Sequence, residues 1–176
     1  MKTAAVIDLD GTLVAGNTFT LYVRSLFPRR PRIILPVLLR KLRLISHARA
    51  KEQIMQAGAP DKFLQQFVDR LCGLVRPDVL ALSENCEVRI LATAAPEAYS
   101  LPLGQLLGFT HILATRKGLP ENKSEEKCRR VVELLEAENA TLKVGATDHP
   151  DDSPLVRAFP EADWHIIGSR YTLADF

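Results

Sequence analysis

Cysteine is scarce in this sequence, and its spacing supports no structural role. The 176 residues include three cysteines, which lie far apart and form no Cys-x-x-Cys pair. An odd number of cysteines without paired spacing supports neither a disulfide framework nor a zinc knuckle. We therefore expect reduced thiols and a cytoplasmic protein.

Long apolar runs are also missing. The longest, Ile33–Leu39, has seven residues and contains Pro36, whereas a membrane-spanning helix needs about 20. The first apolar segment, Thr3–Ile7, is followed at once by Asp8 and Asp10, where the apolar region of a signal peptide would continue. The sequence therefore predicts neither a transmembrane helix nor a secretion signal.

Acidic residues are absent from one long segment. Between Gly11 and Lys51 there is no Asp or Glu but there are nine Lys or Arg, so with a net charge of +2 the rest of the chain carries −7 (2 − 9). The overall charge is too small to indicate a nucleic-acid partner. The basic segment has three interpretations: a solvated face, a field that attracts an anionic substrate, or a membrane or partner surface, because residues 32–51 are also amphipathic.

The remaining sequence alternates short apolar runs with helical patterns. Strands are expected at Ala4–Ile7, Val88–Ala92, His111–Thr115, Leu142–Ala146 and Trp164–Ile167. Each resembles a strand that is buried on both faces of a parallel sheet. Helices are expected between them at Pro96–Leu107, Ser124–Ala140 and Asp152–Phe159. This alternation predicts an α/β fold with a doubly wound parallel sheet.

A second region, from about residue 17 to residue 75, has only helical patterns. Asn17 is a suitable N-cap, and Gly58 fits the end of a helix. Since this region follows the first strand, it is expected to be a small all-helical insertion. The predicted organisation is a discontinuous α/β core, residues 1–15 and 86–176, with a helical cap at residues 16–85.

Polar residues follow several of the predicted strands, at the sheet edge where open α/β folds bind ligands. The residues expected there are Asp8, Asp10, Thr12, Thr93, Lys123, Thr147, Asp148, Asp151 and Asp152. One lysine cannot offset four or five carboxylates, which repel and raise one another's pKa. Oxygen ligands without His or Cys favour Mg²⁺, which binds through one or two carboxylates plus a phosphate. The sequence thus predicts a magnesium site and a phosphorylated substrate.

Four short motifs resemble those of the haloacid dehalogenase superfamily of phosphotransferases. Asp8–Thr12, "DLDGT", resembles the first motif, and Thr93 at the end of "VRILAT" resembles the second. Lys123 in "ENKSEEK" resembles the third, a lysine before a helix. "TDHPDDSPLV" resembles the fourth, with Asp148 and Asp152 spaced by four. The resemblance covers nearly the whole chain and is nearest to the phosphoserine-phosphatase-like branch, which inserts a helical cap between the first two motifs.

The resemblance implies a role for each motif residue. Asp8 is the expected nucleophile, which becomes an aspartyl phosphate. Asp10 is the expected general acid and base, and Gly11 lets the chain turn away from the strand. The expected phosphate-binding residues are Thr12, Thr93 and Lys123, with the Thr12 hydroxyl also able to hold the turn.

The resemblance also implies a set of metal ligands. The expected Mg²⁺ ligands are Asp8, Asp10 (through its backbone carbonyl), Asp148 and Asp152. Asp152 is expected either to orient Lys123 or to bind the metal through water. Asp151 departs from the family pattern, where a small or neutral residue is more usual, so the assignment of Asp151 against Asp152 stays open.

Together these features predict a Mg²⁺-dependent phosphatase for a small phosphate monoester. An acid two residues after the nucleophile suits phosphate esters, and the dehalogenase and phosphonate-cleaving branches of the superfamily lack it. Two alternatives stay open. One is a non-enzymatic phosphate-binding or membrane-surface module on the same scaffold, and the other is a phosphotransferase or phosphomutase.

Overall fold

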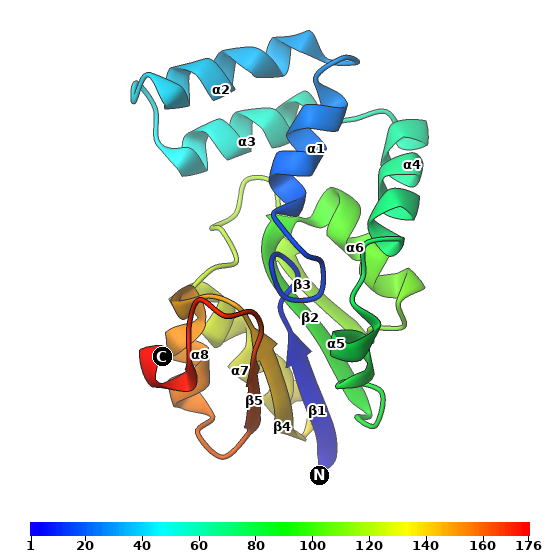
Figure 1. Ribbon diagram of the computed structural model, residues 1–176, viewed down its shortest axis with the longest axis vertical. Coiled ribbons are helices and arrows are strands. Elements are labelled where there is room, and N and C mark those ends of the chain that lie inside the picture. The colour runs from blue at the N-terminus through cyan, green and yellow to red at the C-terminus, as the bar shows by residue number, and fades with distance from the viewer.

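The chain folds around one parallel β-sheet with helices on both faces (Figure 1). The computed structural model describes residues 1–176. The sheet has five strands in the order β3-β2-β1-β4-β5, and every neighbouring pair is parallel. The strands are β1 (Lys2–Ile7), β2 (Val88–Pro96), β3 (His111–Thr115), β4 (Ala140–Thr147) and β5 (Asp163–Ile166). The predicted α/β class is confirmed, and each expected strand is present.

Alternate residues of the central strands belong to two hydrophobic clusters, one on each face of the sheet. In β1, Ala4 and Val6 belong to one cluster and Ile7 to the other. The first face is covered by α7 (Glu125–Glu138) and α8 (Ser153–Ala158), and the second by α6 (Glu97–Leu106). Burial on both faces explains why these strands are almost uninterrupted apolar runs.

The segment between β1 and β2 is helical. Its helices are α1 (Thr18–Leu26), α2 (Ile34–Lys41), α3 (His47–Ala57), α4 (Asp61–Cys72) and α5 (Pro77–Ala81). Figure 1 places α1 to α4 above the carboxyl end of the sheet, whereas α5 lies lower, at the level of the sheet. The cap boundaries at residues 16 and 85 stay a prediction. None of the helices in the structure combines the length and the apolar character that crossing a bilayer requires.

Local signals at two of these helices agree with the sequence. The Asn17 side chain accepts a hydrogen bond from the Thr20 backbone at the start of α1. Gly58 ends α3 with a positive φ of 63°, a conformation that favours glycine.

An aromatic cluster joins the helical insertion to the sheet. Tyr22 from α1 and Phe67 from α4 each lie 5.2 Å, centroid to centroid, from Tyr99 of α6. All three rings are almost fully buried. The insertion is therefore anchored in the same hydrophobic cluster that covers one face of the sheet.

Replacement of Phe67 tests this anchoring. Phe67→Ala should lower the free energy of unfolding by about 3–5 kcal/mol, because it removes a buried ring and leaves a cavity. The control is Gln66→Ala, an exposed neighbour in the same helix, which should change it little. Urea unfolding followed by circular dichroism measures both. A Phe67→Ala cost as small as that of the control would contradict the anchoring.

Candidate active site

The site lies at the carboxyl ends of β1 and β4, where the sheet order changes direction. From β1 the chain goes to β2 and β3 on one side, then crosses to β4 and β5 on the other. In such sheets the crevice at this switch point is the usual ligand-binding position. Asp8 follows β1 directly and Asp148 follows β4 directly, so the two carboxylates come from the two strands that border the crevice.

The loop after β1 is held in a tight turn. The backbone amides of Leu13 and Val14 donate to the carbonyls of Asp8 and Leu9, at 3.2 and 2.9 Å. Leu9 and Leu13 are fully buried. Their burial fixes the loop and leaves Asp8 and Asp10 to line the cleft on its other side.

Asp8 makes an ion pair with Lys127, which was not among the expected site residues. Lys127 Nζ lies 2.8 Å from Asp8 Oδ1 and 2.7 Å from Asp152 Oδ1. The second oxygen of Asp152 also accepts a hydrogen bond from the Thr147 hydroxyl, at 2.7 Å. All four side chains are buried or nearly so. This chain of contacts holds one cation between two carboxylates beneath the cleft.

Lys123, expected in this position, lies elsewhere. Its Nζ is 2.8 Å from Asp151 Oδ2, and about half of both side chains is exposed at the edge of the cleft. The structure therefore places Lys127, and not Lys123, against Asp8. It also distinguishes the two neighbouring acids, because Asp152 pairs with the buried lysine and Asp151 with the exposed one.

The sequence contains a signal for Lys127. Lys127, Val131 and Leu135 are spaced by four and form the buried stripe of α7. A lysine that continues this stripe in the first turn points at the sheet edge, whereas a lysine before the helix has no such constraint.

Asp10 faces the start of the helical insertion. Its Oδ1 accepts a hydrogen bond of 2.6 Å from the backbone amide of Thr18, the first residue of α1. The Thr18 hydroxyl lies 3.0 Å from the Tyr99 hydroxyl. Burial raises the pKa of Asp10, although the hydrogen bonds from Thr18 oppose the shift. A raised pKa suits a group that must carry a proton near neutral pH.

Asp148 lies against Gly11. A Cβ built on Gly11 would come 1.9 Å from Asp148 Oδ2, and Gly11 has a φ of 79°. The Thr12 hydroxyl donates to Asp148 Oδ1 at 3.3 Å and is fully buried. Thr12 therefore supports Asp148 in this structure and is not among the residues that line the cleft.

Two further residues support the site without having been expected. The Arg76 guanidinium donates to the carbonyls of Gly11 and Thr12, at 2.9 and 3.1 Å. The Asn122 amide donates to the carbonyls of Thr93 and Leu113, at 3.1 and 2.7 Å. Neither has a sequence signal, because both bind backbone carbonyls that only the folded chain brings near. Thr93 itself lines the cleft as expected.

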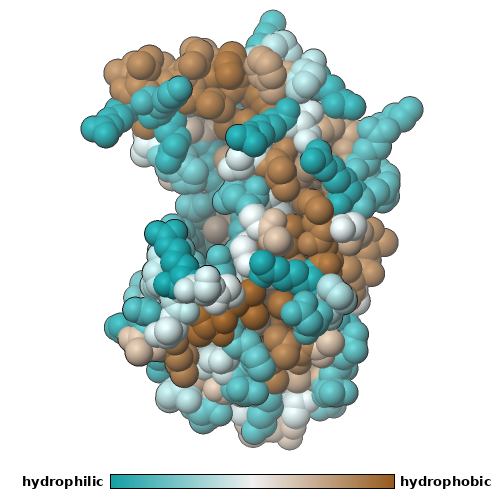
Figure 2. Space-filling model, in the orientation of Figure 1, coloured by the Kyte–Doolittle hydropathy of each residue, from teal (hydrophilic) through white to brown (hydrophobic).

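A cleft of about 550 Å³ opens over these groups, between the insertion and the sheet edge. It corresponds to the hollow on the left side of the space-filling view in Figure 2. Its walls are largely polar, and the insertion contributes Arg40, His47 and Lys51. Lys51 Nζ reaches from α3 to the carbonyl of Ala94 and to the Glu121 carboxylate. The sheet side adds His149, which the fourth motif had placed in this loop.

The carboxylates of the cleft are short of positive charge. Burial, with Asp152 and Asp10 adding to it, raises the pKa of Asp8 to about 7, while Lys127 opposes the shift. Burial also raises the pKa of Asp148. Burial lowers the pKa of Lys127, but Asp152 and Asp8 outweigh it, and the net shift is upward. The lysine therefore stays charged, and a further cation would favour the ionised form of the remaining acids.

These residues fit a magnesium ion that is bound mainly by water and substrate. No three His, Cys, Asp or Glu side chains converge as a ready ligand set. Asp152 has both oxygens engaged by Lys127 and Thr147. Asp8 and Asp148 each have only Oδ1 engaged, by Lys127 and by Thr12, so each keeps a second oxygen for a metal. Two carboxylates with water are an ordinary Mg²⁺ donor set.

Sequence comparison agrees with this geometry. The sequence profile of the haloacid dehalogenase-like hydrolases matches residues 5–157. The chain belongs to this family. Comparison with curated protein sequences gave no match.

Solved structures share the haloacid dehalogenase-like fold at low identity. A Bordetella pertussis Tohama I protein described as of unknown function is 17% identical with a TM-score of 0.72, over 90% of this chain and 87% of its own. A phosphoserine phosphatase, solved as a phospho-aspartyl intermediate analogue, is 13% identical with a TM-score of 0.61. The match covers 95% of this chain and 94% of that protein. A hydrolase of this family from Salmonella enterica serovar Typhi is 14% identical with a TM-score of 0.67, over 88% of this chain. The present chain spans only 59% of that protein.

The close approach of Asp148 to Gly11 can be tested with matched substitutions. Gly118 has a similar φ of 76° and nothing within 4 Å of its added Cβ. Gly118→Ala should therefore lower the free energy of unfolding only by the backbone penalty of about 1–2 kcal/mol. Gly11→Ala should lower the free energy of unfolding by about 1–3 kcal/mol more than Gly118→Ala does, because the new methyl group displaces Asp148. Thermal and urea unfolding measure the difference. Equal costs would show that Asp148 does not occupy this position.

Proposed function

We propose that this protein is a Mg²⁺-dependent phosphatase, which hydrolyses a small phosphate monoester through an aspartyl phosphate on Asp8. The observation that supports this most directly is the buried contact of Asp8 with Lys127, with Asp10 two residues away facing the same cleft. The hydrolase family and the fold shared with phosphoserine phosphatases are consistent with it. The cytoplasmic location expected from the cysteine pattern stays a prediction.

In the first half-reaction, an Asp8 oxygen attacks phosphorus and the bond from phosphorus to the ester oxygen breaks. Lys127 favours the ionised form of Asp8, because it opposes the upward pKa shift that burial causes. Asp10 gives its proton to the departing alkoxide, so the alcohol leaves neutral. The contacts support this division of roles, since Asp8 is paired with a cation and Asp10 is not.

In the second half-reaction, water attacks the phosphorus of the aspartyl phosphate. Asp10, now ionised, accepts a proton from that water, and the bond from phosphorus to Asp8 breaks to release inorganic phosphate. Asp10 thereby returns to its protonated form, and the carboxylate of Asp8 is restored. Asp10 must change protonation state twice in each turnover, which its raised pKa allows.

The phosphoryl oxygens are assigned to Lys127 and to Thr93, the cleft residue at the end of β2. We assign Mg²⁺ to the carboxylates of Asp8 and Asp148 and to the backbone carbonyl of Asp10, and Asp152 serves to orient Lys127. The ion would neutralise charge on the phosphoryl group, which is the main demand of phosphoryl transfer.

Replacing the proposed nucleophile tests the mechanism. Asp8→Asn should reduce Mg²⁺-dependent hydrolysis of an aryl phosphate by about a thousandfold or more, because the amide cannot form the covalent intermediate. Asp151→Asn, at the exposed edge of the cleft, is the control and should stay within a few-fold of the unaltered protein. Retained activity in Asp8→Asn would contradict the mechanism, and phosphoryl transfer to an alcohol instead of water would indicate a phosphotransferase.

The two lysines make a second test. Lys127→Met should lower the rate of aryl phosphate hydrolysis by about 100- to 1000-fold, the range for a lost charge-stabilising donor. Lys123→Met removes an exposed lysine of the same segment and should change it only a few-fold. Thermal unfolding of both variants separates a catalytic loss from a folding defect. If Lys123→Met lost activity while Lys127→Met kept it, the phosphate contact would belong to Lys123.

A further inference from the structure

α2 and the segments that flank it expose an unusual number of large apolar side chains. Half of the twelve exposed large hydrophobic residues of the protein lie between residues 27 and 44. They are Phe27, Ile34, Leu35, Leu38, Leu42 and Leu44, named here the α2 patch. Figure 2 shows it as the brown strip along the top of the molecule. The patch lies at the far end of the insertion from the sheet.

Helical spacing explains why the patch residues within α2 and at its C-cap share one face. Ile34, Leu38 and Leu42 are four residues apart, so they project on the same side of the helix. Ile33 and Pro36, on the other side, are buried. The helix thus buries apolar residues on its inner side and presents a second apolar stripe to solvent. The folding of this chain alone does not require the exposed stripe.

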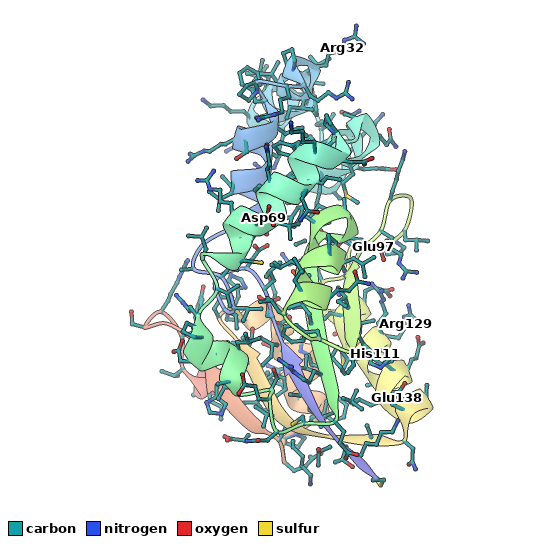
Figure 3. All side chains as sticks on the ribbon, turned by 90° about the vertical axis from the view of Figure 1, so that its right-hand side faces the viewer. Arg32, Asp69, Glu97, His111, Arg129 and Glu138 are labelled. Carbon is teal, nitrogen blue, oxygen red and sulfur yellow. The ribbon has the colours of Figure 1, made fainter.

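Positive charge surrounds the patch without internal compensation. Its exposed basic neighbours are Arg29, Arg30, Arg32, Lys41 and Arg43. None of them forms an ion pair within the chain. Arg32, labelled in Figure 3, extends away from the body of the protein. Because no acidic residue occurs between Gly11 and Lys51, these charges remain available to an outside anion.

We propose that the α2 patch docks the protein on an anionic lipid bilayer surface. In this arrangement α2 lies along the interface, with the exposed leucines below the headgroups and the arginines and lysines at the lipid phosphates. An apolar surface within a positive rim is complementary to an apolar interior beneath a negative surface. A second copy of the chain would bring this positive segment against itself, and like charges oppose such a contact.

Vesicle binding of the full chain tests the proposal. The protein should sediment with phosphatidylcholine vesicles that contain phosphatidylglycerol and much less with phosphatidylcholine alone, and salt should weaken the binding. The double variant Leu35→Gln with Leu38→Gln should reduce the partition coefficient by about tenfold or more. Its control is Leu106→Gln with Leu119→Gln, where the leucines are 62% and 60% exposed on other surfaces, and this variant should bind normally.

A charge-matched pair tests the electrostatic part. Arg32→Glu with Arg43→Glu should weaken binding to anionic vesicles, whereas Lys62→Glu with Lys143→Glu changes net charge equally and should have little effect. Equal weakening by both pairs would show that only net charge matters and would overturn the proposal. Absence of vesicle binding would also overturn the proposal. A dimer seen in sedimentation velocity, and dissociated by the Leu35 and Leu38 substitutions, would overturn it as well. Each readout is independent of phosphatase activity, so its failure leaves the proposed function untouched.

Discussion

The structure depends on one lysine held between two buried carboxylates at the edge of the sheet. Lys127 comes from α7, Asp8 from the end of β1, and Asp152 from the turn before α8. The three segments approach one another only when the sheet is assembled with its helices. Removing a single partner would leave a buried charge without compensation, which is far more costly than exchanging the whole set. The pairing therefore ties the site to the integrity of the fold.

The cleft is acidic at its base and basic at its rim. Burial is the main cause of the raised pKa values of Asp8, Asp10 and Asp148, and neighbouring acids add to it at Asp8 and Asp148. Arg40 and Lys51, from the insertion, face the cleft from the other side. A site of this polarity favours a ligand that brings both a dianionic group and a cation, as a phosphate with magnesium does. The acid-rich sheet edge and the acid-free segment between Gly11 and Lys51 are thus complementary across the cleft.

Much of this arrangement can be predicted from the sequence, because strands and strand ends have local signals. The apolar runs predicted each strand, and the residues after them predicted that Asp8, Asp10, Thr93 and Asp148 meet at one edge. The choice between Lys123 and Lys127 depends on which way a helix presents its first turn, and the motif resemblance favours Lys123, the lysine outside the helix. Arg76 and Asn122 could not be predicted, since their partners are backbone carbonyls that become neighbours only through tertiary packing.

Thr18 links Asp10, the proposed general acid and base, to the anchoring of the insertion. Its amide holds the Asp10 carboxylate, and its hydroxyl meets the Tyr99 hydroxyl inside the aromatic cluster. The first turn of α1 is therefore shared by the wall of the cleft and by the acid at its base. A ligand that shifted α1 by a fraction of an ångström would alter the strength of the hydrogen bond to Asp10 and with it the acidity of that group. Under the proposed mechanism, a ligand could therefore affect proton transfer by Asp10 through its contacts with α1, without touching Asp10 itself.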